Sequence, residues 1–80
     1  MTSTPPTPPR TPPSFAERVN SNVRAELARR KISTQGAAAM IDKSSETVRR
    51  RLAGQQEWPL GDLDLLARRL DIDPEVFAAA

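Results

Sequence analysis

Eighty residues are enough for one small domain, and the formal net charge of +2 conceals an uneven distribution. Residues 1–56 carry ten basic and four acidic side chains, whereas residues 57–80 carry two and six. The absence of His and Cys excludes a histidine general base, a cysteine nucleophile, a disulfide and a His/Cys metal site. No apolar run approaches the roughly 20 residues of a membrane span, and no signal peptide is visible. We therefore expect a soluble intracellular protein that is not an enzyme and needs no cofactor, small-molecule ligand or membrane.

Proline dominates the first thirteen residues, which hold six of the eight prolines in the chain. Proline removes backbone donors, and this segment has almost no apolar side chains to bury. We expect residues 1–13 to form a disordered or polyproline-II tail. A PxxP ligand for a partner protein is the alternative interpretation. The folded domain then comprises residues 14–80.

The first predicted helix begins after Ser14, because Glu17 three residues later completes a capping box and the prolines prevent an earlier start. Apolar residues then recur every four positions and form one stripe, namely Val19, Val23 and Leu27. We expect this helix to run from about Phe15 to Lys31.

A second, short helix is predicted over residues 34–41, with Ser33 as its N-cap. Alanine is its commonest residue, at three of eight positions, and such small residues imply that another helix packs very close. Asp42 is expected to end this helix in a left-handed conformation, which Asp tolerates better than most residues.

A third helix is predicted over residues 44–53, and Ser44 is its expected cap. Val48 and Leu52 lie four residues apart, so both are expected to face the core. Gly54 is expected to end the helix, since glycine adopts the left-handed conformation without strain.

A fourth, amphipathic helix follows over residues 60–70, and Trp58 before it is expected to fill the core beneath the preceding loop. Its apolar stripe comprises Leu60, Leu63, Leu66, Ala67 and Leu70. Asp73 and Pro74 suit the start of a last turn that brings in Val76 and Phe77. No segment alternates with period two, so the predicted fold is all-α, a compact bundle of four to five helices.

The segment from Ser33 to Gly54 predicts a helix-turn-helix, in which two short helices cross around small and apolar residues. Over about residues 15–77 the chain resembles the Cro/CI-type (lambda-repressor-like, XRE-type) helix-turn-helix family of phage and bacterial repressors. The resemblance depends on Ser33-Thr34-Gln35-Gly36-Ala37-Ala38, Ile41-Asp42-Lys43-Ser44, Val48, Gly54, and Trp58-Pro59-Leu60 through Leu70-Asp71-Ile72. Arg51 stands where the family tends to be apolar, and Leu52 is expected to take over that packing role.

The geometry of helix 44–53 divides its polar residues into two sets. With Val48 inward, a rotation of about 100° per residue directs Arg50 outward and leaves Arg49 and Arg51 on the flanks. The candidate base-reading residues are Ser45, Glu46, Thr47 and Arg50. The candidate phosphate-binding residues are Thr34, Gln35, Lys43, Ser44, Arg49 and Arg51. The alternative is a solvated basic face with an ordinary pair between Glu46 and Arg50.

These observations, together with the resemblance, predict a sequence-specific regulator of transcription that binds double-stranded DNA in a bacterial cytoplasm, at the nucleoid. The simplest form is a Cro-like repressor that occludes promoter or operator sites. A palindromic operator and a homodimer are expected, with assembly either in solution or only on DNA, and Trp58, Val76 or Phe77 as the candidate dimer contact. The alternatives are a protein-interaction module and an antitoxin- or excision-type accessory protein.

Overall fold

The computed structural model describes residues 13–80, and the expected proline-rich tail lies, apart from Pro13, outside that range. Within residues 13–80 the elements are α1 (Phe15–Arg29), α2 (Thr34–Ile41), α3 (Ser45–Leu52), α4 (Leu60–Leu70) and a 3₁₀ helix, η1 (Pro74–Ala78). This part of the chain contains no strand, so the all-α prediction is confirmed. None of its helices is long and apolar enough to cross a membrane.

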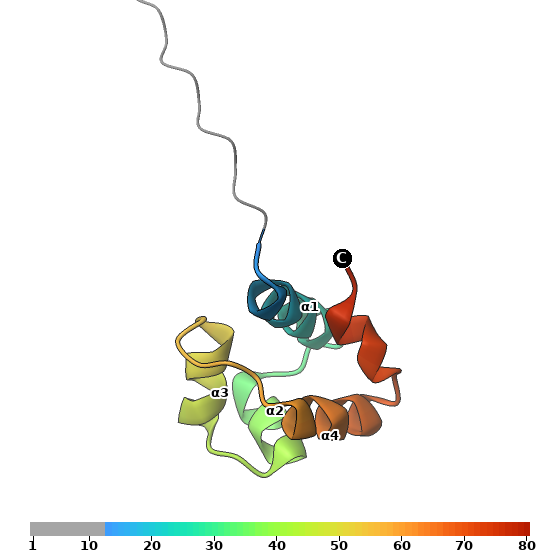
Figure 1. Ribbon diagram of the computed structural model, residues 1–80. Helices are drawn as coiled ribbons and strands as arrows, with labels where there is room; N and C mark the ends of the chain where they lie inside the picture. Colours follow the sequence, from blue (N-terminus) through green and yellow to red (C-terminus); the bar gives the residue numbers. More distant parts are fainter. Residues whose placement is uncertain (1–12) are drawn as a thin grey trace, which may run out of the picture.

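Helix α2 lies at the centre of the bundle and packs on both α3 and α4 (Figure 1). Helix α1 contacts α3 and η1, and η1 also packs on α4. The largest fully buried side chains come from four different elements, namely Val23, Val48, Leu66 and Phe77. The smaller residues Ala37 and Ala38 of α2 are also buried, as the close helix packing predicted from the alanine run requires.

All four α-helices end in the same way, with a left-handed residue directly after the last turn. These residues are Lys31, Asp42, Gly54 and Asp71. After α1, for example, the amide of Lys31 donates to Ala28 (3.1 Å) and that of Ile32 donates to Leu27 (2.9 Å). This pair of bonds is a Schellman motif, which satisfies the last carbonyls of a helix. Helix α1 therefore ends at Arg29 and not at the expected Lys31, while the predicted stops at Asp42 and Gly54 are confirmed.

Two sequence-based expectations about the core are wrong. Leu60, placed in the apolar stripe of α4, is 79% exposed, because it occupies the first position of that helix at the surface. The residues of α3 that face the core are not the two that were predicted. Val48 is fully buried, but Arg51 is buried beside it and Leu52 is only half-buried.

One amide side chain of α1 forms hydrogen bonds with the backbone of residues 77–79 at the end of the chain. Nδ2 of Asn22 donates to the carbonyls of Phe77 (2.9 Å) and Ala79 (2.7 Å). Figure 1 accordingly shows the C-terminus close to α1. Phe77 and Trp58 belong to the core and are only 1% and 8% exposed, so neither forms the broadly exposed patch suggested by the sequence.

Candidate nucleic-acid interface

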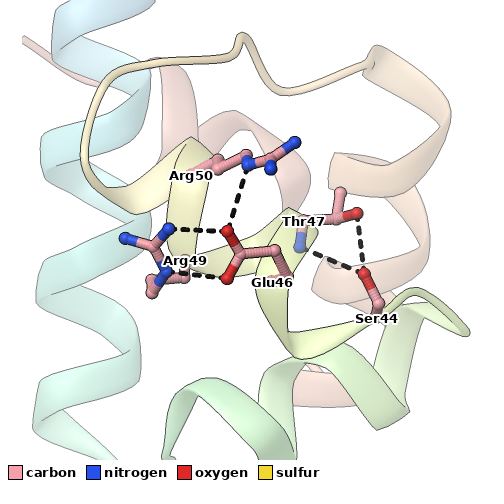
Figure 2. Close-up of polar contacts among 5 residues, drawn as sticks. All are labelled: Ser44, Glu46, Thr47, Arg49 and Arg50. Carbon is pink, nitrogen blue, oxygen red and sulfur yellow. Dashed lines mark hydrogen bonds and ion pairs between the residues drawn. The ribbon is translucent and has the colours of Figure 1, made fainter.

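The N-terminus of α3 is open to solvent and is held by its cap. Oγ of Ser44 accepts a hydrogen bond from the amide of Thr47 (3.1 Å) and shares a second one with the Thr47 hydroxyl (2.9 Å), as Figure 2 shows. Ser44 and Ser45 are exposed, whereas Thr47 is half-buried. The Thr47 hydroxyl is therefore occupied by the cap, and Ser45 is the freer hydroxyl of this turn.

The outer face of α3 carries one carboxylate and two guanidinium groups. Glu46 accepts from Nε of Arg49 (2.9 Å), Nη2 of Arg49 (2.6 Å) and Nε of Arg50 (3.1 Å) (Figure 2). About half of each of the three side chains is exposed. The structure thus brings together two candidate base-reading residues, Glu46 and Arg50, and one candidate phosphate-binding residue, Arg49. The Glu46–Arg50 pair of the alternative interpretation is present as well.

The two arginines also stabilise the ionised form of Glu46. The hydrogen bond from Arg49 is the largest cause that lowers the pKa of Glu46 from its usual 4.5 to about 2, and the charges of Arg49 and Arg50 act in the same direction. The same pair raises the pKa of Arg49. Glu46 is therefore ionised at neutral pH, and the face presents two cations around one carboxylate.

Arg51 does not belong to this surface, so its assignment as a phosphate-binding residue is wrong. Its side chain is buried, with Nη1 lying 2.6 Å from Oδ2 of Asp62 and the guanidinium 5.4 Å from the centroid of the Trp58 ring. Three residues after Val48, position 51 lies only about 60° from the buried direction. The resemblance already marked this position as apolar, and that was the signal for its burial.

Helix α2 and the connection to α3 supply three further candidate residues. Gln35 and Lys43 are exposed, and Thr34 is half-buried. Ser33 caps α2 by accepting from the amide of Gly36 (3.0 Å), as the sequence predicts. Since α2 packs directly on α3, these side chains belong to a unit that also carries Glu46, Arg49 and Arg50.

The C-terminal end of α3 is anchored by Asn20 of α1, a residue that the sequence did not single out. Nδ2 of Asn20 donates to the carbonyl of Leu52 (3.1 Å), and its Oδ1 accepts from Nε1 of Trp58 (3.2 Å). Trp58 is buried, as expected of a side chain that fills the core beneath the loop. A lone Asn between two apolar helix positions gives no local sign of such a role.

A second basic cluster, Arg29 and Arg30 at the end of α1, forms ion pairs with a buried carboxylate. Glu26 is only 6% exposed and accepts from Nη1 of Arg29 (2.8 Å) and from Nη1 of Arg30. The hydrogen bond from Arg30 is the largest cause that lowers the pKa of Glu26. These arginines are therefore engaged within α1, and we do not include them in the candidate interface. On α4, Arg68 forms a surface ion pair with Asp64 (2.9 Å).

No family model, no curated protein and no solved structure matches the chain.

Proposed function

We propose that this protein is a sequence-specific DNA-binding regulator of transcription, most simply a Cro-like repressor that occludes promoter or operator sites. Helices α2 and α3 act as a helix-turn-helix, and α3 enters the major groove. One observation supports this most strongly. Helix α3 buries Val48 and Arg51 on its inner face and presents Glu46, Arg49 and Arg50 on its outer face, beside an exposed, capped N-terminus.

The outer face has groups that match base edges. Arg50 can donate two hydrogen bonds to O6 and N7 of guanine, and the ionised Glu46 can accept from N4 of cytosine. Ser45, exposed in the first turn, suits several bases. This chemistry favours a half-site that contains G·C pairs.

The surrounding residues suit phosphates. Arg49, Lys43 and Gln35 are exposed around the same unit, with Ser44 at the N-terminus of α3 and Thr34 at the start of α2. Cationic and amide donors of this kind position a protein on the DNA backbone without reading sequence. The segment that follows Gln56 holds six acidic and two basic side chains, so α4 and η1 suit the side directed away from DNA.

The pairs within α3 do not prevent DNA binding on energetic grounds. Exposed ion pairs contribute little free energy because solvent screens them, whereas a bidentate arginine–guanine contact is worth about 1–3 kcal/mol. Arg50 can therefore leave Glu46 for a guanine at small cost. On this proposal the hydrogen bond between Glu46 and Arg50 belongs to the protein without DNA and is replaced when DNA binds.

Selection of bound sequences from a random double-stranded DNA pool tests this proposal. We expect enrichment of a short palindromic site with G·C pairs in each half, and half-site centres about 34 Å or a multiple of it apart. Binding of the enriched site is then measured over a salt series. Failure to enrich any sequence, with the helical fold intact by circular dichroism, would contradict the proposal and favour a protein-interaction module.

A further inference from the structure

Two large apolar side chains are exposed in residues 13–80, and both line the same groove. Phe15, the first residue of α1, is 54% exposed, and Leu60, the first residue of α4, is 79% exposed. They line a hollow that Trp58 lines as well. Single exposed apolar residues are common, but a grouped pair in a hollow beside an aromatic ring marks an interaction surface. We call this hollow the α1/α4 groove.

The rim of the α1/α4 groove is acidic. Glu57 lines the groove and also an adjoining hollow, where it is joined by Ser14 and Glu17. Neither Glu17 nor Glu57 forms an ion pair with any basic residue among residues 13–80. A complementary ligand is therefore apolar and carries a positive charge.

The first twelve residues of the chain have this chemistry. They contain five prolines, and Arg10 provides their only charged side chain. Proline-rich segments bind aromatic-lined grooves at low entropic cost, because the polyproline-II conformation is already extended before binding. An arginine beside the prolines can pair with an acidic rim.

The position of the groove favours the tail of a second copy over the chain's own tail. The tail joins the fold at Ser14 and Phe15, which themselves line the two hollows. A return to its own groove would require a tight reversal at Pro12-Pro13, where proline and the residue before it favour an extended backbone. Reciprocal exchange between two copies uses the same surface on both, as two-fold symmetry requires.

We propose that residues 5–12 of one copy bind the α1/α4 groove of a second copy, so that the protein forms a homodimer by exchange of its tails. The proline rings lie against Phe15 and Leu60 at the edge of Trp58, and Arg10 pairs with Glu57 or Glu17. This inference does not depend on the proposed DNA binding.

Sedimentation velocity of the full-length chain over a wide concentration range, without DNA, tests the association. We expect the average mass to rise up to twofold with concentration. Leu60→Ser and Arg10→Glu should each weaken association at least several-fold, and the charge exchange Arg10→Glu with Glu57→Arg should restore it in part. Arg24→Glu is the matched charge control, because Arg24 is exposed and lines neither hollow, and it should associate like the wild type. At a concentration at which the wild type is monomeric, the melting temperature of Leu60→Ser should equal that of the wild type, which separates loss of association from loss of fold.

A spin label tests the exchange itself. The chain has no cysteine and one tryptophan, so Thr7→Cys accepts a single nitroxide and the Trp58 indole gives one NMR signal. In a mixture of spin-labelled chains with ¹⁵N-labelled chains that lack the spin label, exchange broadens the Trp58 signal. Three results would overturn the proposal: a monomer at every concentration, association unaffected by Leu60→Ser and Arg10→Glu, or broadening only when both labels are on the same chain.

Discussion

Nε1 of Trp58 donates a hydrogen bond to Oδ1 of Asn20 (3.2 Å), and the same Asn20 side chain donates to the last turn of α3 through the carbonyl of Leu52 (3.1 Å). One amide on α1 therefore connects the loop before α4 with the end of the proposed recognition helix. Because these partners lie 38 and 32 residues away in the sequence, the amide fixes a tertiary arrangement and not a local turn.

Substitution of Asn20 by alanine leaves the Trp58 indole N–H and the Leu52 carbonyl without their protein partner. An unsatisfied buried polar group costs about 1–3 kcal/mol, so Asn20→Ala should lower the free energy of unfolding by that amount. Urea denaturation followed by Trp58 fluorescence measures it. Ser21→Ala, at the exposed neighbouring position, is the control and should change stability little. Equal midpoints for both variants would show that the Asn20 bonds contribute nothing.

The ion pair between Arg51 and Asp62 gives a second prediction about stability. Both side chains are largely buried, 8% and 17% exposed, and removal of one partner from a buried pair costs about 3–5 kcal/mol. Asp62→Ala should therefore be strongly destabilising, at the lower end of this range because some solvent reaches Asp62. The double variant Arg51→Met with Asp62→Ala should recover part of the loss, since Met can still pack on Trp58. A double variant less stable than Asp62→Ala would contradict this explanation.

Lys31 has a φ of 55°, a left-handed conformation that costs a side chain with a Cβ about 1–2 kcal/mol. Glycine removes this strain, although its greater freedom in the unfolded chain offsets about 0.4–1 kcal/mol. Lys31→Gly should therefore raise stability by up to about 1 kcal/mol, or a few degrees in melting temperature. Lys43→Gly, which has no positive φ to relieve, should lower stability slightly. Calorimetry of the two variants side by side checks the difference in sign.

Glu46 should make a small contribution to the acid dependence of stability, because its ion pairs with Arg49 and Arg50 are exposed to solvent. Its pKa is lowered to about 2 from 4.5, so its ion pairs stabilise the fold fully above pH 4.5 and are lost as the pH falls towards 2. The carboxyl carbon of Glu46 should accordingly titrate in NMR spectra well below pH 4.5. Glu46→Gln should lose less stability than the wild type over the same range, although the lowered pKa of Glu26 leaves a pH dependence in both. A Glu46 midpoint near 4.5 would show that Arg49 does not hold the carboxylate in solution.

The features that the sequence predicted well are local. The side-chain caps at Ser33, Ser44 and Asp73 and the left-handed stop at Asp42 depend on groups within three residues, so a short stretch of chain determines them. The stripe on α1 follows from helical periodicity alone, and Val19, Val23 and Leu27 are all buried.

The features that it missed depend on tertiary partners. Whether Arg51 or Leu52 turns inward is decided by Asp62 and Trp58, which provide a carboxylate and an aromatic face for a buried guanidinium. Asn20 acquires its role only when α3 and the loop before α4 meet α1. In the candidate site the outward direction of Glu46 and Arg50 could be derived from helix geometry. The hydrogen bond between the hydroxyls of Thr47 and Ser44 could not.

The comparison of Arg50 with Arg49 tests the base-reading role assigned to α3. Both are exposed and paired with Glu46, so neither substitution by alanine should unfold the domain. We expect Arg50→Ala to lose about 5–150-fold in affinity for the selected site and much less for scrambled DNA, since a base contact is worth about 1–3 kcal/mol. Arg49→Ala should weaken binding to both DNAs alike and reduce the salt slope by about one unit.

The most direct measurement of the central claim is therefore the ratio of affinities for the selected and the scrambled DNA, determined for the wild type and Arg50→Ala at the same salt concentration. The account predicts that this ratio falls by about the factor that the selected site loses, while circular dichroism and melting temperature stay unchanged. An unchanged ratio in a folded Arg50→Ala variant would contradict base reading by Arg50, and unchanged affinities of both arginine variants for both DNAs would contradict α3 as the DNA-binding helix.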